Sequence, residues 1–413
     1  QDISGCYNLM VYQLFAIFIA TVVIRFTLSL SSFNSDIYNH FAWIDSIASR
    51  GWTNLYQQDV SPWAPINYPP LTIYSFWVGE QIYQYLPIEW HTSNVRAALY
   101  KAPSIITDSL TAVLLLSIPM IAIRWRVIMA IVYLFNPALI YNSVWWGQVE
   151  SLATYFSLLS LLLLARRRVG LSLVVFTTAI LFKQTALPLM PIMLYGIYRN
   201  RPRIKELIGA ALVIASLVYF IYAPLTPHYT NTFVYASENY LSSVGGQPHQ
   251  WEATVNSLNF WYFLGLNHVA DSTIIFSSFT IRQIGSLFTA LGVGIALWYS
   301  SRQSDIYKAI FGSAAIISLW TFMFATRMHE RHIYLGIALL TTILPYLRFS
   351  TPYVLLSFIG FYNLYAVWSE YFVDRSQDLS WIYTSQILAL ISVICVISYP
   401  VWFPARRASI KTA

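Results

Sequence analysis

The sequence predicts an all-α, polytopic membrane protein with about twelve transmembrane helices. Of its 413 residues, 57% are hydrophobic and only 10% are charged, and the mean hydropathy is +0.56. A soluble domain carries about 25% charged residues, so a soluble fold of this chain would have a largely apolar surface. The alternating segments of ~10 residues that are typical of a membrane β-barrel do not occur.

Twelve apolar stretches are candidates for the ~20-residue helix that a membrane requires. The first is too long for the apolar core of a signal peptide and is not followed by a clear small-residue cleavage site. We therefore expect it to be a retained helix. The stretches are residues 9–31, 102–123, 127–143, 149–165, 169–182, 185–198, 206–225, 283–300, 309–326, 333–347, 351–368 and 381–403.

The basic residues orient these stretches. They gather in every second connection, which the positive-inside rule assigns to the cytoplasm together with both termini. The formal net charge of +7 is therefore a topology signal, and we expect no nucleic-acid partner. The residues are Arg124, Arg126, Arg166, Arg167, Arg168, Arg199, Arg201, Arg203, Lys205, Arg302, Lys308, Arg348, Arg406, Arg407 and Lys411.

Two of the outward connections are long, residues 32–101 and 226–282. The first is too long for a simple connector and is expected to hold helices that lie on the membrane. Asn34 to Arg50 predicts one such helix, with Ile37, Phe41, Ile44 and Ile47 on one face. Ser61 to Pro65 predicts a turn, and Tyr74 to Leu86 a further interfacial or re-entrant helix. The second connection is rich in Tyr, Asn, Trp, His and Gly, which suits a sugar or headgroup surface and equally an aromatic belt.

Asp36 follows the first stretch by a few residues and is expected at the outer membrane surface, with His40 one turn later. Two interpretations of Asp36 stay open. It is either an acid at a helix N-terminus, which stabilises the helix dipole, or a general base whose basicity partial desolvation raises.

Other polar residues interrupt or flank the apolar stretches. Lys101 and Asp108 are seven residues apart and share a helical face. An Asp inside the membrane predicts a functional group, and the alternatives are a structural Lys–Asp pair or a structural pair between helices. Gln148 and Glu150 lie in Trp145 to Glu150, and Lys183-Gln184 breaks an apolar run on the same side. Lone polar residues at the end of a span usually anchor it at the interface, but Lys183-Gln184 is flanked by residues of the buried type.

The densest polar cluster is Arg327-Met328-His329-Glu330-Arg331-His332, between two apolar stretches. Arg327 and Arg331 are four apart, as one helical face would place them, and guanidinium groups suit phosphate oxygens. His329 and Glu330 add a hydrogen bonder and an acid. The alternative is interfacial anchoring by basic residues. The spacing does not match the His-Glu-x-x-His zinc motif, and Cys6 and Cys395 lie at opposite ends, so we expect neither a metal site nor a disulfide.

The topology places all of these groups on one membrane face. Asp36, Gln148, Glu150, Lys183 and the cluster at 327–332 therefore predict a site at the outer leaflet, with a carboxylate base and cations for an anionic headgroup.

Several motifs resemble a known family. Asn67-Tyr68-Pro69-Pro70-Leu71-Thr72, Phe182-Lys183-Gln184 and Met328-His329-Glu330-Arg331 are similar to motifs of the GT-C superfamily of polyprenyl-phosphate-sugar-dependent glycosyltransferases. The likeness extends to the dolichol-phosphate-glucose glucosyltransferases and to bacterial mannosyltransferase-like membrane proteins. Lys101 to Leu116 also resembles the bacterial group. The eukaryotic motif has Lys in the place of Arg331, and beyond Ser350 nothing is similar.

The resemblance implies transfer of mannose or glucose from a polyprenyl-phosphate donor to a lipid, glycan or protein acceptor. Asp36 would be the base of an inverting attack, and the leaving phosphate would be met by Arg327, His329, Arg331 or Lys183. Tyr68, Gln184 and Glu330 are further site candidates. No cofactor or metal is expected, and the site would face the outside of a bacterial cytoplasmic membrane. A catalytic module would span 1–348, with C-terminal helices over 349–413. A transporter of a lipid-linked substrate and a non-catalytic subunit of a membrane complex remain alternatives.

Overall fold

The computed structural model describes residues 3–31, 33–58, 60, 65–245, 251–372 and 378–404. These residues form mostly helices, with two short two-stranded sheets. The expectation of a helical chain is confirmed. The turn expected at Ser61 to Pro65 falls mostly outside the described residues, as do Arg406, Arg407 and Lys411.

The helices of the first half follow the apolar pattern with short irregular connections. In chain order they are α1 (Ile3–Ser29), α2 (Asp36–Arg50), η1 (Leu55–Gln57), α3 (Pro70–Gln84), η2 (Ile88–Trp90), α4 (Ser93–Leu116), α5 (Ile123–Leu134), α6 (Pro137–Ile140), the π-helical turn η3 (Tyr141–Trp146), α7 (Glu150–Ala165), α8 (Val169–Phe182), η4 (Gln184–Leu189), α9 (Met190–Asn200), α10 (Ile204–Tyr222) and η5 (Ala223–Leu225).

The second half adds the strands, all of them short. Its elements are α11 (Thr232–Gly245), β1 (Thr254–Val255), α12 (Phe260–Phe263), β2 (Ile274–Phe276), β3 (Phe279–Thr280), α13 (Ile281–Ser301), α14 (Ile306–Phe324), β4 (Met328–His329), η7 (Glu330–Ile333), α15 (Tyr334–Thr342), η8 (Leu344–Tyr346), α16 (Thr351–Phe372), α17 (Leu379–Ile397) and α18 (Tyr399–Trp402). Strands β1 and β4 pair in parallel, with Thr254 opposite Met328 and Val255 opposite His329. Strands β2 and β3 form an antiparallel hairpin.

Each of the twelve predicted stretches contains a helix. In the described part of the chain, five helices are long and apolar enough to cross a membrane. They are Ser93–Leu116, Ile204–Leu225, Ile281–Ser301, Ile306–Phe324 and Leu379–Ile397. A sixth results if Ile123–Leu134 and Pro137–Trp146, which meet at a 46° bend, count as one span. The expected number of about twelve crossings therefore stays a prediction.

Two predicted boundaries differ from the structure for identifiable reasons. Helix α4 begins at Ser93, well before residue 102, because Thr92 caps it by accepting from the backbone N of Val95. The stretch 127–143 is broken before Pro137, whose missing N–H and ring favour a new helix start. Similarly, Pro70 opens α3, so the second half of the Asn67 to Thr72 motif is helical.

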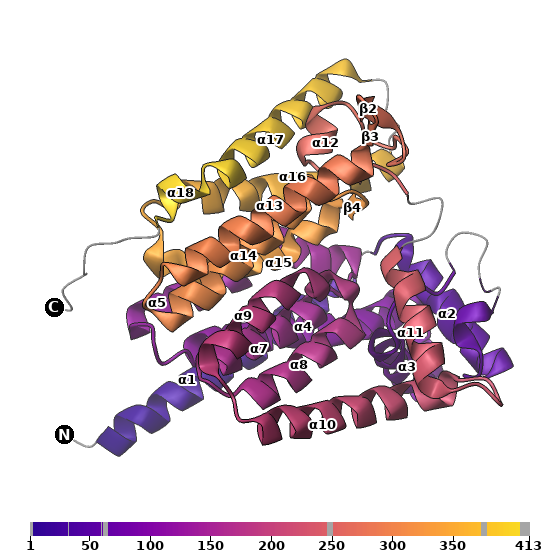
Figure 1. Ribbon diagram of the computed structural model, residues 1–413. Helices are drawn as coiled ribbons and strands as arrows, with labels where there is room; N and C mark the ends of the chain where they lie inside the picture. Colours follow the sequence, from indigo (N-terminus) through magenta and orange to yellow (C-terminus); the bar gives the residue numbers. More distant parts are fainter. Residues whose placement is uncertain are drawn as a thin grey trace.

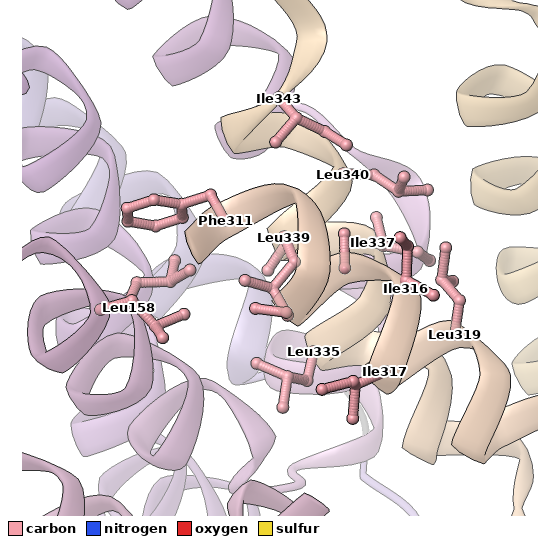
Figure 2. Packing of buried hydrophobic residues seen from close by; sticks show 14 of the residues in the cluster. Leu158, Phe311, Ile316, Ile317, Leu319, Leu335, Ile337, Leu339, Leu340 and Ile343 are labelled. Atoms are coloured by element: carbon pink, nitrogen blue, oxygen red, sulfur yellow. The ribbon is translucent and has the colours of Figure 1, made fainter. Parts of the chain in front are cut away.

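The expected amphipathic helix is confirmed as α2, in which Ile37, Phe41, Ile44 and Ile47 are all buried. Its buried face joins a cluster that includes Phe76 of α3. The larger core lies between α7, α14 and α15, where Leu158, Phe311, Leu319, Leu335 and Leu339 pack together (Figure 2).

The elements that carry polar groups lie toward one end of the helix bundle. In Figure 1, α2, α3 and α11 gather at the right, whereas the beginning of α1 and α18 lie at the left. Helix α16 packs against α6 and η7, and α17 packs against α12 and α14. The helices after residue 349 are thus in direct contact with the preceding part of the chain.

Candidate active site

Asp36 is the first residue of α2. Its backbone N donates to Oδ1 of Asn34 at 3.1 Å. Its Oδ2 accepts from Trp146 Nε1 at 3.1 Å and from Gln148 Nε2 at 2.5 Å. Within the described residues, Oδ1 of Asp36 receives no hydrogen bond. The carboxylate therefore contacts the end of η3 and the loop after it, and one of its oxygens stays available.

A glycine allows this contact. Gly147 lies between the two donors and has φ +84°, a left-handed conformation that favours glycine. A Cβ at this position would come within 2.7 Å of Cδ1 of Ile37, the residue after Asp36. The close approach of α2 to the η3 loop thus depends on the absence of a side chain at Gly147.

Hydrogen bonds connect Asp36 to a second group of charges. The Tyr68 hydroxyl donates to Oε1 of Gln148 at 2.9 Å. The same tyrosine ring lies beneath Nζ of Lys183, 4.8 Å from its centroid. Lys183 ends α8 in an extended conformation, φ −156° and ψ 136°, which confirms the predicted break at Lys183-Gln184.

The second group is a buried ion-pair network. Lys183 Nζ lies 2.5 Å from Oε1 of Glu150, and both side chains are 3% exposed. Arg331 Nη1 lies 2.8 Å from Oε1 of Glu330, and Arg331 Nε lies 3.7 Å from Oε1 of Glu150. Oε2 of Glu150 is buried without a hydrogen-bond partner in the described structure. Two cations and two carboxylates therefore share one low-dielectric position, where their attraction is strong.

The segment 327–332 does not form the helix that the spacing of its arginines predicts. Arg327 has φ +64°, and Met328 and His329 follow as strand β4. Arg327 is held by other contacts. Its backbone N donates to the carbonyl of Glu252 at 2.9 Å and its Nε to Oδ2 of Asp271 at 2.8 Å. Strand β4, which pairs with β1, separates the two arginines. Arg327 therefore pairs with Asp271, and Arg331 pairs with Glu330.

The histidines of this region are neutral. Burial lowers the pKa of His40 to about 3, against the attraction of Asp36 and with the help of Lys183 and Arg331. Burial and the charge of Arg331 lower the pKa of His329 and of His332 well below the ordinary value. These rings are therefore hydrogen bonders rather than cations. The His40 ring stacks on Phe76 with centroids 4.3 Å apart.

The cluster also shifts the pKa of its acid and its guanidinium. Burial raises the pKa of Glu330 despite the charge of Arg331. Burial lowers the pKa of Arg331, but Glu330, Tyr68, Asp36 and Glu150 outweigh it and raise the pKa overall. Since Asp36 acts on the pKa of both groups, it belongs to the same electrostatic cluster.

A cavity of about 520 Å³ adjoins the cluster. Its size is in the range of small-ligand sites, roughly 300–1,000 Å³. One part of its wall is polar, with Tyr68, Lys183, Gln184, Arg327, His329, Arg331 and His332. The part formed by η4, α9, α13 and α14 carries the apolar side chains Leu187, Pro188, Pro191, Val293 and Phe322, with the hydroxyls of Thr289, Ser318 and Thr321 among them. The cavity therefore combines a cationic region with an apolar slot.

Lys101 and Asp108 do not line this cavity. Lys101 Nζ donates to the carbonyls of Ser29 at 3.1 Å and Val144 at 2.8 Å. Asp108 pairs with Arg25, whose Nη1 lies 2.7 Å from its Oδ2. The contacts match a structural inter-helix pair between Arg25 of α1 and Asp108 of α4, and Lys101 and Asp108 do not pair with each other.

Sequence reasoning missed four residues that hold the cluster in place. Arg25 is a lone charge inside the first apolar stretch, a signal that was sufficient to single it out. Trp146 lies within a motif that was singled out, but nothing marked its indole as a donor to Asp36. Asp271 and Tyr334 carry no local signal, because their partners are distant in sequence.

No family model matches the chain, and no curated protein matches it. In the described residues, no group of three or more His, Cys, Asp or Glu side chains is arranged to hold a metal ion. The site must therefore be interpreted from its own geometry.

Proposed function

We propose that the chain is an integral-membrane glycosyltransferase of the GT-C type. It would transfer a hexose, mannose or glucose, from a polyprenyl-phosphate donor to a hydroxyl of a lipid, glycan or protein acceptor. The observation that carries the proposal is the cavity with cations in one part of its wall and apolar side chains in the other. A lipid phosphate has the same division between an anionic headgroup and an apolar chain.

The donor phosphate would lie beside Lys183, Arg327 and Arg331. Arginine and lysine side chains are the usual partners of phosphate oxygens. The apolar slot between η4, α9, α13 and α14 would take the first isoprene units. Buried cations act strongly on developing charge, so they would stabilise the departing phosphate.

Asp36 would be the general base. Trp146 and Gln148 fix its Oδ2, which leaves Oδ1 to accept the proton of the acceptor hydroxyl. That oxygen would form a bond to the anomeric carbon while the bond from this carbon to the phosphate oxygen breaks. The polyprenyl phosphate would leave with the electron pair, and the sugar would invert. A positioned base of this kind contributes about 10²–10⁴-fold to a rate.

The wider arrangement belongs to the same proposal. The chain would cross a bacterial cytoplasmic membrane about twelve times, with both termini in the cytoplasm and the site facing outward. Its partners would be the lipid-linked donor, the acceptor and membrane lipids. The reaction would need no cofactor, because the cations of the chain meet the charge of the leaving group.

A radiolabelled polyprenyl-phosphate hexose tests this function with the purified chain in vesicles. The proposal expects release of polyprenyl phosphate and a labelled product with inverted configuration. Movement of intact donor across the vesicle membrane would instead support a transporter. Neither cleavage nor movement, with the donor and a panel of acceptors present, would support a non-catalytic subunit.

A further inference from the structure

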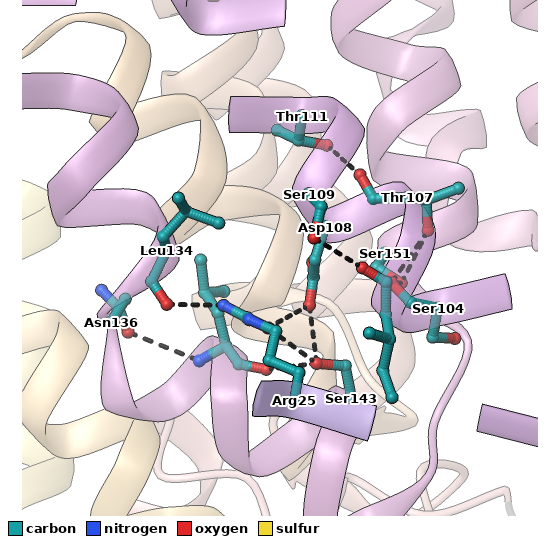
Figure 3. A network of polar contacts seen from close by, with 12 residues as sticks. Arg25, Ser104, Thr107, Asp108, Ser109, Thr111, Leu134, Asn136, Ser143 and Ser151 are labelled. Carbon is teal, nitrogen blue, oxygen red and sulfur yellow. Dashed lines mark hydrogen bonds and ion pairs between the residues drawn. The ribbon is translucent and has the colours of Figure 1, made fainter. Parts of the chain in front are cut away.

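Asp108 is the centre of a buried network that joins several helices. It lies in α4 and is fully buried. Its Oδ2 accepts from Arg25 Nη1 at 2.7 Å and from Ser143 Oγ at 2.6 Å, as Figure 3 shows. Its Oδ1 accepts from the hydroxyl of Tyr133 at 3.0 Å and also from that of Tyr334. One carboxylate thus accepts from residues of α1, η3, α5 and α15.

Two of these donors are in segments of the candidate site: Ser143 is in residues 141–148, and Tyr334 is in residues 327–334. Ser143 lies three residues before Trp146, which donates to Asp36. Tyr334 lies three residues after Arg331, which pairs with Glu330. The other two donors, Arg25 and Tyr133, lie outside both segments.

Arg25 strengthens the connection to η3. Its Nη2 donates to the carbonyl of Leu134 at 2.5 Å. Leu134 ends α5, just before the 46° bend that leads into η3. The ion pair therefore holds both the bend and Ser143 against α4.

We propose that Asp108 is a positioning residue that fixes the spacing between the base segment, residues 141–148, and the phosphate segment, residues 327–334. This inference rests on the proposed function for its catalytic meaning. Asp108 contacts no cavity-lining residue in the described structure. It acts because the same carboxylate anchors Ser143 on one segment and Tyr334 on the other.

The contacts of Asp108 provide a matched set of variants. Tyr334→Phe and Tyr133→Phe each remove one phenol hydroxyl from the same Oδ1. Each also removes the 3.2 Å contact between the two hydroxyls, so the two variants differ in whether the bond between Asp108 and Tyr334 is kept. Only Tyr334 continues into the phosphate segment. Ser143→Ala removes a donor from the base segment, and Asp108→Asn disrupts both. Loss of stability alone would affect the two phenylalanine variants alike.

The first readout is the distance between the two parts, measured by electron–electron double resonance on the full chain. Nitroxide labels at Tyr38→Cys and Phe276→Cys use exposed side chains, 58% and 71%, in a background without Cys6 and Cys395. Tyr38 belongs to α2. Phe276 ends β2. This strand follows Asp271, which accepts from Arg327, and β1, which pairs with β4, so the label reports on the phosphate segment. We expect Asp108→Asn and Tyr334→Phe to broaden the distance distribution and Tyr133→Phe to leave it unchanged.

The second readout is binding of farnesyl phosphate, an isoprenyl monophosphate. Loss of one hydrogen bond of about 0.5–1.5 kcal/mol corresponds to roughly two- to tenfold in affinity. Tyr334→Phe is expected to weaken binding by this factor, whereas Ser143→Ala should slow transfer without weakening binding. If wild-type protein binds no phosphate and transfers no sugar, the proposed function fails, but the distance measurement still decides on Asp108. Equal distance distributions in Asp108→Asn and wild type would overturn the inference.

Discussion

Replacing Glu150 by Gln tests whether this carboxylate is the counter-ion of the donor-phosphate cations. Glu150 lies 2.5 Å from Lys183 Nζ and 3.7 Å from Arg331 Nε. Glutamine keeps the shape of the side chain but removes its charge. Arg331 would keep its ion pair with Glu330, and Lys183 would lose its ion pair with Glu150. The site would gain a net positive charge before any ligand binds.

The size of the effect follows from the burial of the pair. Removing one partner of a buried ion pair costs about 3–5 kcal/mol of stability, mainly because a charge is left uncompensated. A phosphate that binds beside Lys183 relieves part of this cost. Relief of ~1.4 kcal/mol corresponds to tenfold tighter binding. We therefore expect Glu150→Gln to unfold at a lower temperature and to bind farnesyl phosphate about tenfold more tightly.

Thermal unfolding of the solubilised protein, with and without farnesyl phosphate, measures both effects. Glu80→Gln is the matched control. Glu80 is also a buried carboxylate, paired with Arg96 Nε at 2.7 Å. Its partner Arg96 does not line the cavity, whereas Lys183 and Arg331, the partners of Glu150, do. The control should lose stability without a change in affinity. Weaker phosphate binding in Glu150→Gln, with normal binding in Glu80→Gln, would refute the counter-ion role and assign Glu150 a direct contact with the ligand.

Three further predictions concern single features of the site. Gly147→Ala should destabilise the fold by about 2–4 kcal/mol, because alanine is strained in the left-handed conformation and its Cβ would contact Ile37. The variant should slow transfer more than it weakens phosphate binding. An unchanged melting temperature and unchanged activity would contradict the close approach of Gly147 to α2. Because unfolded His40 takes up a proton near its ordinary pKa of 6.5 and folded His40 only near 3, the unfolded state binds more protons between these values. Stability should therefore fall by about 5 kcal/mol as the pH falls through this whole window. His40→Phe should show a smaller loss from pH 7 to pH 4, which an identical pH dependence would disprove. Transfer should continue after chelation and removal of divalent metals, and activity that returns only on adding a metal would show that the cations of the chain are not sufficient.

The local features of the fold were predictable from the sequence. The apolar spacing of Ile37, Phe41, Ile44 and Ile47 identifies α2, because one buried face repeats with the helical period. The polar break at Lys183 is equally visible. Proline and capping effects then move the ends of α4 and α5, because a single residue such as Thr92 or Pro137 decides where a helix begins.

The contacts of the site were less predictable, because they depend on tertiary structure. The spacing of Arg327 and Arg331 suggests a helix, but Arg327 is left-handed and Met328-His329 pairs with β1 as a short strand. Asp108 and Arg25 each stand out in an apolar stretch, yet nothing in the sequence pairs them. Sequence identified most of the charged residues of the cluster, whereas the structure was needed to assign a partner to each.

Asp36 carries the proposed chemistry, and the variant Asp36→Asn tests its role as the base. Asparagine fits the same position beside Trp146 and Gln148 but cannot take the acceptor proton. Transfer from a radiolabelled polyprenyl-phosphate hexose and binding of farnesyl phosphate should be measured on the same preparation. Transfer should fall by about 10²–10⁴-fold, while binding should stay within about twofold of wild type. Full transfer activity in Asp36→Asn would contradict the role of Asp36 as the base.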